Sequence, residues 1–330
     1  MRTTRHLVAR LAALVFALLL AAPTVTAAPV TRSSAQAAPA ATKDAFTRKS
    51  DTAPKARERG SINVTELAAQ PKKTHKQMAK PRGTLPKRSG TTTAPRAATT
   101  NIAPLVLTPS TANAAPTPIQ QNPLPGLASG GGFTNVEPAD PWVAVGPDHV
   151  VQFVNTGVRI QNRQGVLSAT DTSTFDFFFL PTTVPTFNSD GRVIYDSLHA
   201  RWIATEVSWD CSPHDDFDGL SLLGRGYLDF AISTTADPTG DWDIYYVPFN
   251  DSFPDYPAAG TSTDKVALTS NVFPIVDGDC GLGTLQGTEI DVMDWAKILA
   301  PGGLNPATDV DGFVSDNTIS TPRAAVQVPA

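Results

Sequence analysis

Aspartate is the residue type with the clearest chemical potential in this sequence. Residues 131–330 carry 27 acidic side chains, of which 24 are aspartate, and many of them fall in loops. Two loops contain an Asp-x-Asp-Gly core, one with Asp216 and Asp218, the other with Asp309 and Asp311. Calcium prefers such oxygen clusters, although neither loop has an acid at the twelfth position of the EF-hand pattern. These four aspartates are therefore candidate calcium ligands, with turn formation as their alternative role. The sequence indicates no other cofactor.

Other catalytic patterns are incomplete. The serine in residues 219–224 is spaced one residue too far from its second glycine for a nucleophile elbow. The histidines of the acidic segment, His149, His199 and His214, are dispersed, and neither an HExxH motif nor a paired-cysteine zinc motif occurs. The catalytic residues stay unassigned, and the sequence favours a protein that is not an enzyme.

Cys211 and Cys280 are the only cysteines of the chain. Paired thiols persist as disulfides in proteins that reach an oxidising compartment. A Cys211–Cys280 bond closes a loop of about 70 residues and contributes roughly 3–4 kcal/mol on the loop-entropy model. Two free buried thiols are the alternative.

The N-terminus has the organisation of an export signal. Residues 1–27 combine arginines at positions 2, 5 and 10 with an apolar run and small residues before an expected cleavage point. We therefore expect a secreted, extracellular protein. The apolar run is short for a transmembrane span, and no later segment approaches about 20 apolar residues, so we expect no transmembrane segment.

The remaining chain divides by composition into a spacer at residues 28–130 and a domain at residues 131–330. The spacer is rich in Ala, Pro and Thr and has Phe46 as its only aromatic residue, which predicts disorder. A short helical turn over Val64–Gln70, capped by Asn63 or Thr65, is the one element expected in it. After Gly130–Gly132 the sequence becomes richer in aromatic residues, valine and aspartate, which marks the start of the domain.

Charge separates the same two segments. Fifteen basic and four acidic residues give residues 28–100 a net charge of +11, while eight basic and 27 acidic residues give residues 131–330 a net charge of −19. The acidic domain is a poor candidate for nucleic-acid binding. The basic spacer is either a solvated tether or a segment attracted to anionic wall polymers.

The domain is predicted to be all-β. Short alternating segments bounded by turn residues predict strands at 150–155, 158–161, 193–196, 202–207, 227–233, 242–247 and 265–270. One helix is expected over Thr288–Leu299, because acids lie near its start and Lys297 near its end.

Four phrases of the domain carry a resemblance to a known family; they are Ala144–Gln152, Tyr195–Asp196 with Arg201–Trp202, Ile232–Trp242, and Phe253–Pro257. In this order and spacing they resemble secreted bacterial β-propeller proteins loosely related to sialidase-type propellers. The resemblance covers about residues 140–300. The stretch Thr235–Trp242 is similar to the Asp-box of those propellers with one extra residue, which implies a structural turn around Asp237. Phe253–Pro257 is expected to connect two blades.

A propeller blade needs about 40–50 residues, so the domain supplies three to four blades of an incomplete ring. We expect a truncated reading of a longer protein, and the alternative is a compact four-blade or open sheet assembly with an exposed edge. We expect a secreted binding protein that recognises carbohydrate or another cell-surface polymer. Trp142 and Trp209 are candidate sugar platforms, with burial in the core as the favoured role of both. The alternative is a sialidase-like glycoside hydrolase with part of its active site beyond residue 330, for which the candidate residues are Arg192, Arg201, Arg225, Tyr195 and Glu206.

Overall fold

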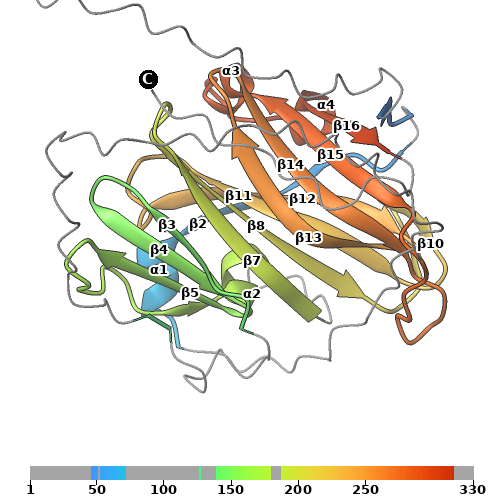
Figure 1. Ribbon diagram of the computed structural model, residues 1–330, viewed down its shortest axis with the longest axis horizontal. Coiled ribbons are helices and arrows are strands. Elements are labelled where there is room, and N and C mark those ends of the chain that lie inside the picture. Colours follow the sequence, from blue (N-terminus) through green and yellow to red (C-terminus); the bar gives the residue numbers. More distant parts are fainter. Residues whose placement is uncertain (1–45, 51–52, 72–125, 128–138, 180–186, 316–330) are drawn as a thin grey trace, which may run out of the picture. The chain divides into compact units, whose positions relative to one another are not determined.

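Antiparallel β-sheets make up most of the folded chain (Figure 1). The computed structural model describes residues 46–50, 53–71, 126–127, 139–179 and 187–315. All of these belong to one compact unit, Lys43–Ala330. The predicted export signal at 1–27 lies outside the described residues. No helix in the described part of the chain is long and apolar enough to cross a membrane.

The first sheet is a meander in the order β3-β4-β5-β6. Its strands are β3 (Trp142–Val145), β4 (His149–Val154), β5 (Gly157–Asn162) and β6 (Thr172–Ser173). The predicted strands at 150–155 and 158–161 are confirmed, with the expected turn between them. Helix α2 (Thr174–Phe179) leads from β6 to the second sheet.

The second sheet has the order β2-β12-β11-β8-β7. Four of its strands follow one another along the chain: β7 (Phe187–Asp196), β8 (Arg201–Asp210), β11 (Arg225–Ser233) and β12 (Asp241–Asn250). The small hairpin of β9 (His214–Asp216) and β10 (Gly219–Ser221) is inserted between β8 and β11. The fifth strand, β2 (Arg57–Asn63), comes from the N-terminal segment and pairs with β12.

The third sheet repeats this plan in the order β1-β16-β15-β14-β13. Its consecutive strands are β13 (Ser252–Thr261), β14 (Lys265–Pro274), β15 (Gly287–Asp294) and β16 (Val310–Val314). The two-residue strand β1 (Thr47–Arg48) adds to β16 at the edge. Two single-turn helices, α3 (Trp295–Ile298) and α4 (Pro306–Asp309), lie between β15 and β16.

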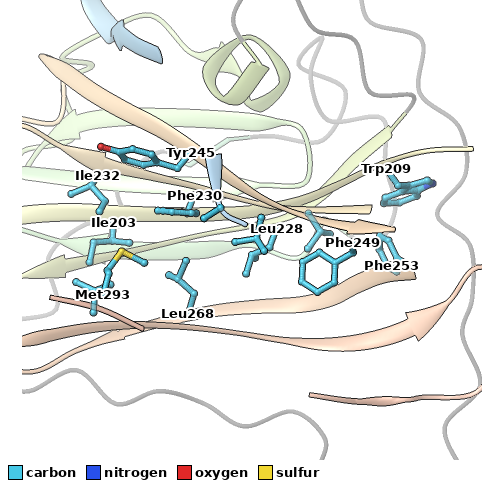
Figure 2. Packing of buried hydrophobic residues seen from close by; sticks show 14 of the residues in the cluster. Ile203, Trp209, Leu228, Phe230, Ile232, Tyr245, Phe249, Phe253, Leu268 and Met293 are labelled. Carbon is cyan, nitrogen blue, oxygen red and sulfur yellow. The ribbon is translucent and has the colours of Figure 1, made fainter. Parts of the chain in front are cut away.

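Two hydrophobic cores hold the three sheets together in layers. One lies between the second and third sheets and includes Phe230, Phe249, Leu268 and Met293 (Figure 2). The other lies between the first and second sheets, where Phe153 of β4 contacts α2 and the strands of the second sheet. The second sheet is therefore apolar on both faces, which explains why its strands carry continuous rather than strictly alternating apolar residues.

Trp202 and Trp242 anchor the second sheet as large buried side chains. The Trp242 indole donates a hydrogen bond to the Pro238 carbonyl over 2.9 Å, and Asp237 accepts one from the Thr239 amide over 2.9 Å. The Asp-box-like stretch is thus a structural turn at the start of β12.

The predicted disulfide is confirmed. Cys211 follows β8 of the second sheet and Cys280 lies in the loop after β14 of the third sheet, with their Cα atoms 5.3 Å apart. Cys280 is buried in the core between these sheets, and Cys211 packs against it. The bond therefore links two layers that are adjacent in space but 69 residues apart in sequence.

Three sequence predictions are wrong. Thr288–Leu299 is not a helix, because residues up to Asp294 form β15 and only α3 is helical. Phe253–Pro257 is part of strand β13 rather than a connection. The N-terminal segment is not wholly disordered, since residues 46–50 and 53–71 include β1, β2 and α1. The other residues of the predicted 28–130 spacer lie outside the described part, apart from Gly126 and Leu127.

Helix α1 (Val64–Ala69) matches the short turn expected from the sequence. The Asn63 side chain accepts a hydrogen bond from the Glu66 amide over 3.1 Å, which satisfies one of the free amides at the helix start. Val64 is buried in the core between the first and second sheets. Tertiary contact therefore stabilises a helix that is too short to persist alone.

Candidate functional site

A cavity of about 390 Å³ opens where the first strands of the three sheets meet. These strands are β3, β7 and β13, each an edge strand of its sheet, and each contributes residues to the cavity lining. Acidic and aromatic side chains dominate the lining, together with one arginine: Asp140, Trp142, Asp190, Arg192, Asp255 and Tyr256. The cavity volume falls within the range of small-ligand sites.

Each of the three aspartates lies in or just before the first strand of one sheet. Asp140 lies two residues before the start of β3, and Asp190 and Asp255 lie at β-bulges of β7 and β13. The backbone is left-handed at Asp140 (φ 41°), Asp190 (φ 63°) and Tyr256 (φ 57°). Such φ values are uncommon for residues other than glycine, so the surrounding structure must hold these bends in place. The bends direct an acidic residue of each sheet to the lining of one cavity.

Asn155 connects two of these bends. Its side-chain amide donates to Asp140 over 3.0 Å, and its side-chain carbonyl accepts from the Asp190 amide over 2.8 Å. The Ser189 hydroxyl donates to Asp190 over 2.9 Å. Because Asn155 is buried in the turn between β4 and β5, it fixes the first and second sheets relative to each other at the cavity.

Arg192 brings a cation to the cavity between two aromatic rings. Its guanidinium lies 3.9 Å from the ring centre of Tyr256 and 5.0 Å from that of Trp142. These rings belong to β13 and β3, so Arg192 of β7 contacts both neighbouring sheets. A smaller cavity of about 60 Å³ adjoins the same Trp142 and Arg192 side chains. Cation–π contacts restrict the arginine while leaving its N–H groups able to donate to a ligand.

A buried carboxyl group lies on the second sheet near this site. Glu206 of β8 accepts a hydrogen bond from Asn188 over 2.9 Å. Complete burial raises the pKa of Glu206 well above its ordinary value, and Asn188 and Thr174 oppose this while the nearby carboxylates Asp229 and Asp190 reinforce it. Burial therefore favours the protonated form of Glu206.

The structure places the four predicted calcium ligands beside cationic side chains. Asp216 accepts two bonds from Arg225, at 2.8 and 2.9 Å, and Asp218 accepts one from Arg57 over 2.6 Å. Asp309 lies 3.5 Å from Lys297, and Asp311 pairs with Arg48. Within the described ranges, no group of three or more His, Cys, Asp or Glu side chains is arranged to hold a metal ion. Calcium binding stays a prediction, and the four aspartates are not brought to one place.

The residues of the sialidase-like alternative are also dispersed. Arg201 and Arg225 lie at opposite ends of β8, since Arg225 pairs with Asp210, the last residue of that strand. A ten-residue strand separates its ends by roughly 30 Å. Tyr195 packs on Trp202 at the Arg201 end, and only Arg192 reaches the cavity. These residues therefore form no arginine cluster with Tyr195 and Glu206.

The two candidate sugar platforms have different environments. Trp209 is buried against Phe187 and Phe253, with ring centres 4.0 and 4.6 Å away, and is a core residue. Trp142 is half-buried and lines the cavity. Burial of Trp209 agrees with the core role that the sequence favoured, whereas Trp142 is accessible from the cavity.

Sequence reasoning did not single out Asp140, Asp190, Asp255 or Tyr256. The three stretches share one pattern, an aspartate followed by two residues and then valine or alanine, at positions 140–143, 190–193 and 255–258. The same pattern also occurs at 148–151, 264–267 and 311–314, so it does not by itself single out the three cavity aspartates. Comparisons with protein-family models, curated proteins and solved structures give no match to this chain.

Proposed function

We propose that this protein is an exported binding protein whose cavity between β3, β7 and β13 holds a sugar unit of a cell-surface polymer. The observation that carries the proposal is the lining of this cavity, where two aromatic rings, one guanidinium and three carboxyl groups come from three sheets. Aromatic faces bind the apolar faces of sugar rings, while carboxylates and arginine exchange hydrogen bonds with hydroxyl groups.

The sheet plan supports a propeller as the architecture behind this site. Each sheet contains four antiparallel strands in chain order, to which β2 or β1 is added in the second and third sheets, and the first strands of the three sets line one cavity. Blades around a central axis are expected to bring their innermost strands together in this way. We infer that the three sheets are successive blades and that the cavity lies at the axis.

Export is supported by two independent features. The sequence of residues 1–27 has the pattern of a secretory signal. The Cys211–Cys280 disulfide is typical of proteins that mature in an oxidising compartment.

The formal charge of the cavity indicates the class of sugar. Three aspartates against one arginine give a formal charge of −2. A carboxylated sugar such as a sialoside would meet net repulsion, whereas a neutral sugar or an amino sugar would not. We therefore favour neutral or amino-sugar polymers, and we place the hydrolase alternative second because its arginines do not converge.

Glycan binding by the signal-processed full-length protein tests the proposal. We expect binding to chitin or chitosan oligosaccharides in calorimetry and weaker binding to sialyllactose. Trp142→Ala should weaken binding at least tenfold, which corresponds to about 1.4 kcal/mol. Phe217→Ala is the matched control, because Phe217 is an aromatic residue that is 72% exposed and outside the cavity lining. Equal affinity of the Trp142→Ala variant and the unmodified protein would refute the site.

A further inference from the structure

The N-terminal strand β2 is added to the outer edge of the second sheet (Figure 1). It runs antiparallel to β12, from Asn63 opposite Asp241 to Arg57 opposite Tyr246. Side chains reinforce the pairing, since Ser61 donates to Asp243 over 2.6 Å and Asn63 donates to Asp241 over 2.8 Å. The segment thus binds the domain through backbone pairing at a sheet edge, as peptide ligands do in β-augmentation.

Arg59 provides the most buried ion pair of this strand. Its side chain is only 8% exposed and donates to Asp229 over 2.8 Å. The guanidinium also lies 4.2 Å from the ring centre of Tyr246 and 5.4 Å from that of Tyr227. Asp229 belongs to β11, so Arg59 reaches past the edge strand to a carboxylate inside the sheet.

Arg57, two residues earlier in the strand, binds a second acidic site on the same sheet edge. It donates to Asp218 over 2.6 Å and to the Phe217 carbonyl over 2.8 Å. Its guanidinium also lies 4.7 Å from the Phe217 ring centre. The edge therefore offers two acidic positions, each with an aromatic neighbour, that match the arginines of an Arg-x-Arg sequence.

Burial of Asp229 makes the cation necessary to this edge. The Asp229 side chain is fully buried, and its other oxygen accepts a bond from Ser208 over 2.6 Å. Burial raises the pKa of Asp229, and the Arg59 guanidinium acts in the opposite direction. A buried carboxylate that loses its cationic partner is strongly unfavourable, so the edge requires a basic side chain at this position.

The covalent connection does not by itself explain this placement. Seventy residues separate Pro71 from Trp142, the first residue of β3. A chain of that length reaches up to about 230 Å, so it imposes little constraint on where β2 binds. Contacts at the edge, rather than chain connectivity, must hold the strand in place.

We propose that the β12 edge, with Asp229 and Asp218, is a binding site for a basic β-strand of the Arg-x-Arg type. Residues 57–63 are its resident ligand, and they bind as a separable peptide would. The inference does not depend on the function proposed for the cavity. It implies that a chain cut after α1 stays together as a two-piece protein.

The test uses the folded full-length protein with a cleavage sequence for a site-specific protease inserted between residues 100 and 101. After cleavage, the N-terminal piece should co-elute with the domain in size-exclusion chromatography. Synthetic peptides of residues 46–71 are then added in excess to displace a fluorescently labelled N-terminal piece. The domain stays unmodified throughout, so a folding defect cannot imitate the result.

The unmodified peptide should displace the labelled piece. A peptide with Arg59→Gln should require at least tenfold more peptide for the same displacement. Arg48→Gln is the matched control, because it removes the same charge from a side chain that is 67% exposed, and its peptide should act within threefold of the unmodified one. Release of the piece immediately after cleavage, failure of every peptide to displace it, or equal potency of the two variants would each overturn the proposal.

Discussion

Removal of the Cys211–Cys280 disulfide should destabilise the domain by an amount set mainly by the length of the loop that it closes. The bond joins residues 69 positions apart and links the second sheet to the third. On the loop-entropy model, a loop of this length contributes about 4 kcal/mol at 25 °C. For a domain of roughly 200 residues, each kcal/mol shifts the melting temperature by about 2–4 °C. The double variant Cys211→Ala/Cys280→Ala should therefore melt about 8–16 °C lower.

Differential scanning calorimetry of the oxidised protein, the reduced protein and the double variant measures this effect. Alanine is chosen because Cys280 is buried and a serine there would add the cost of an unpaired hydroxyl group. The reduced protein and the double variant should melt within a few degrees of each other. A decrease of under about 3 °C in both would refute the reasoning, because it would mean that the bond does not restrict the unfolded chain.

Two further predictions concern the second sheet and its contacts. A Cβ atom on Gly146 would lie 2.5 Å from the buried ring of Trp202, so Gly146→Ala should lower the free energy of unfolding in urea by about 1–3 kcal/mol. Gly278→Ala is the control, because a Cβ atom there would have no atom within 4 Å, and it should change the free energy of unfolding by under about 0.5 kcal/mol. Burial raises the pKa of Glu206, so the folded state holds a proton that the unfolded state releases above about pH 4, and stability falls as pH rises toward the folded-state pKa. Glu206→Gln removes this loss and should be more stable than the unmodified protein at pH 8 but not at pH 4; the same difference at both values would contradict a raised pKa.

Local patterns predicted most of the strands. The stretches at 202–207 and 227–233 lie within β8 and β11, because β-branched and aromatic residues bounded by turn formers favour strands wherever a sheet can form. The strand predicted at 193–196 is also confirmed, but the prediction was too short, because β7 begins at Phe187 and contains a bulge before Arg192. A bulge interrupts the alternation of side chains, which hides the start of the strand from a pattern reading.

The helix predicted over Thr288–Leu299 failed for a tertiary reason. Its acids were interpreted as favourable charges at a helix start, but Glu289 and Asp291 are buried on one face of β15. Glu289 accepts a hydrogen bond from Lys49 over 2.7 Å, and these residues are 240 positions apart. A local pattern cannot reveal so distant a partner, so the alternation of buried acids and β-branched residues was misassigned.

The sequence alone determined the β-rich class, the export pattern and the pairing of its two cysteines, because each depends on composition or on the absence of another partner. Only the tertiary structure decided the cavity and the docking of residues 46–71. Asp140, Asp190 and Asp255 are up to 115 positions apart and meet because three sheets stack with their first strands adjacent. The N-terminal segment is too poor in apolar residues to fold alone, yet it adds to an existing sheet edge whose buried acids need its cations.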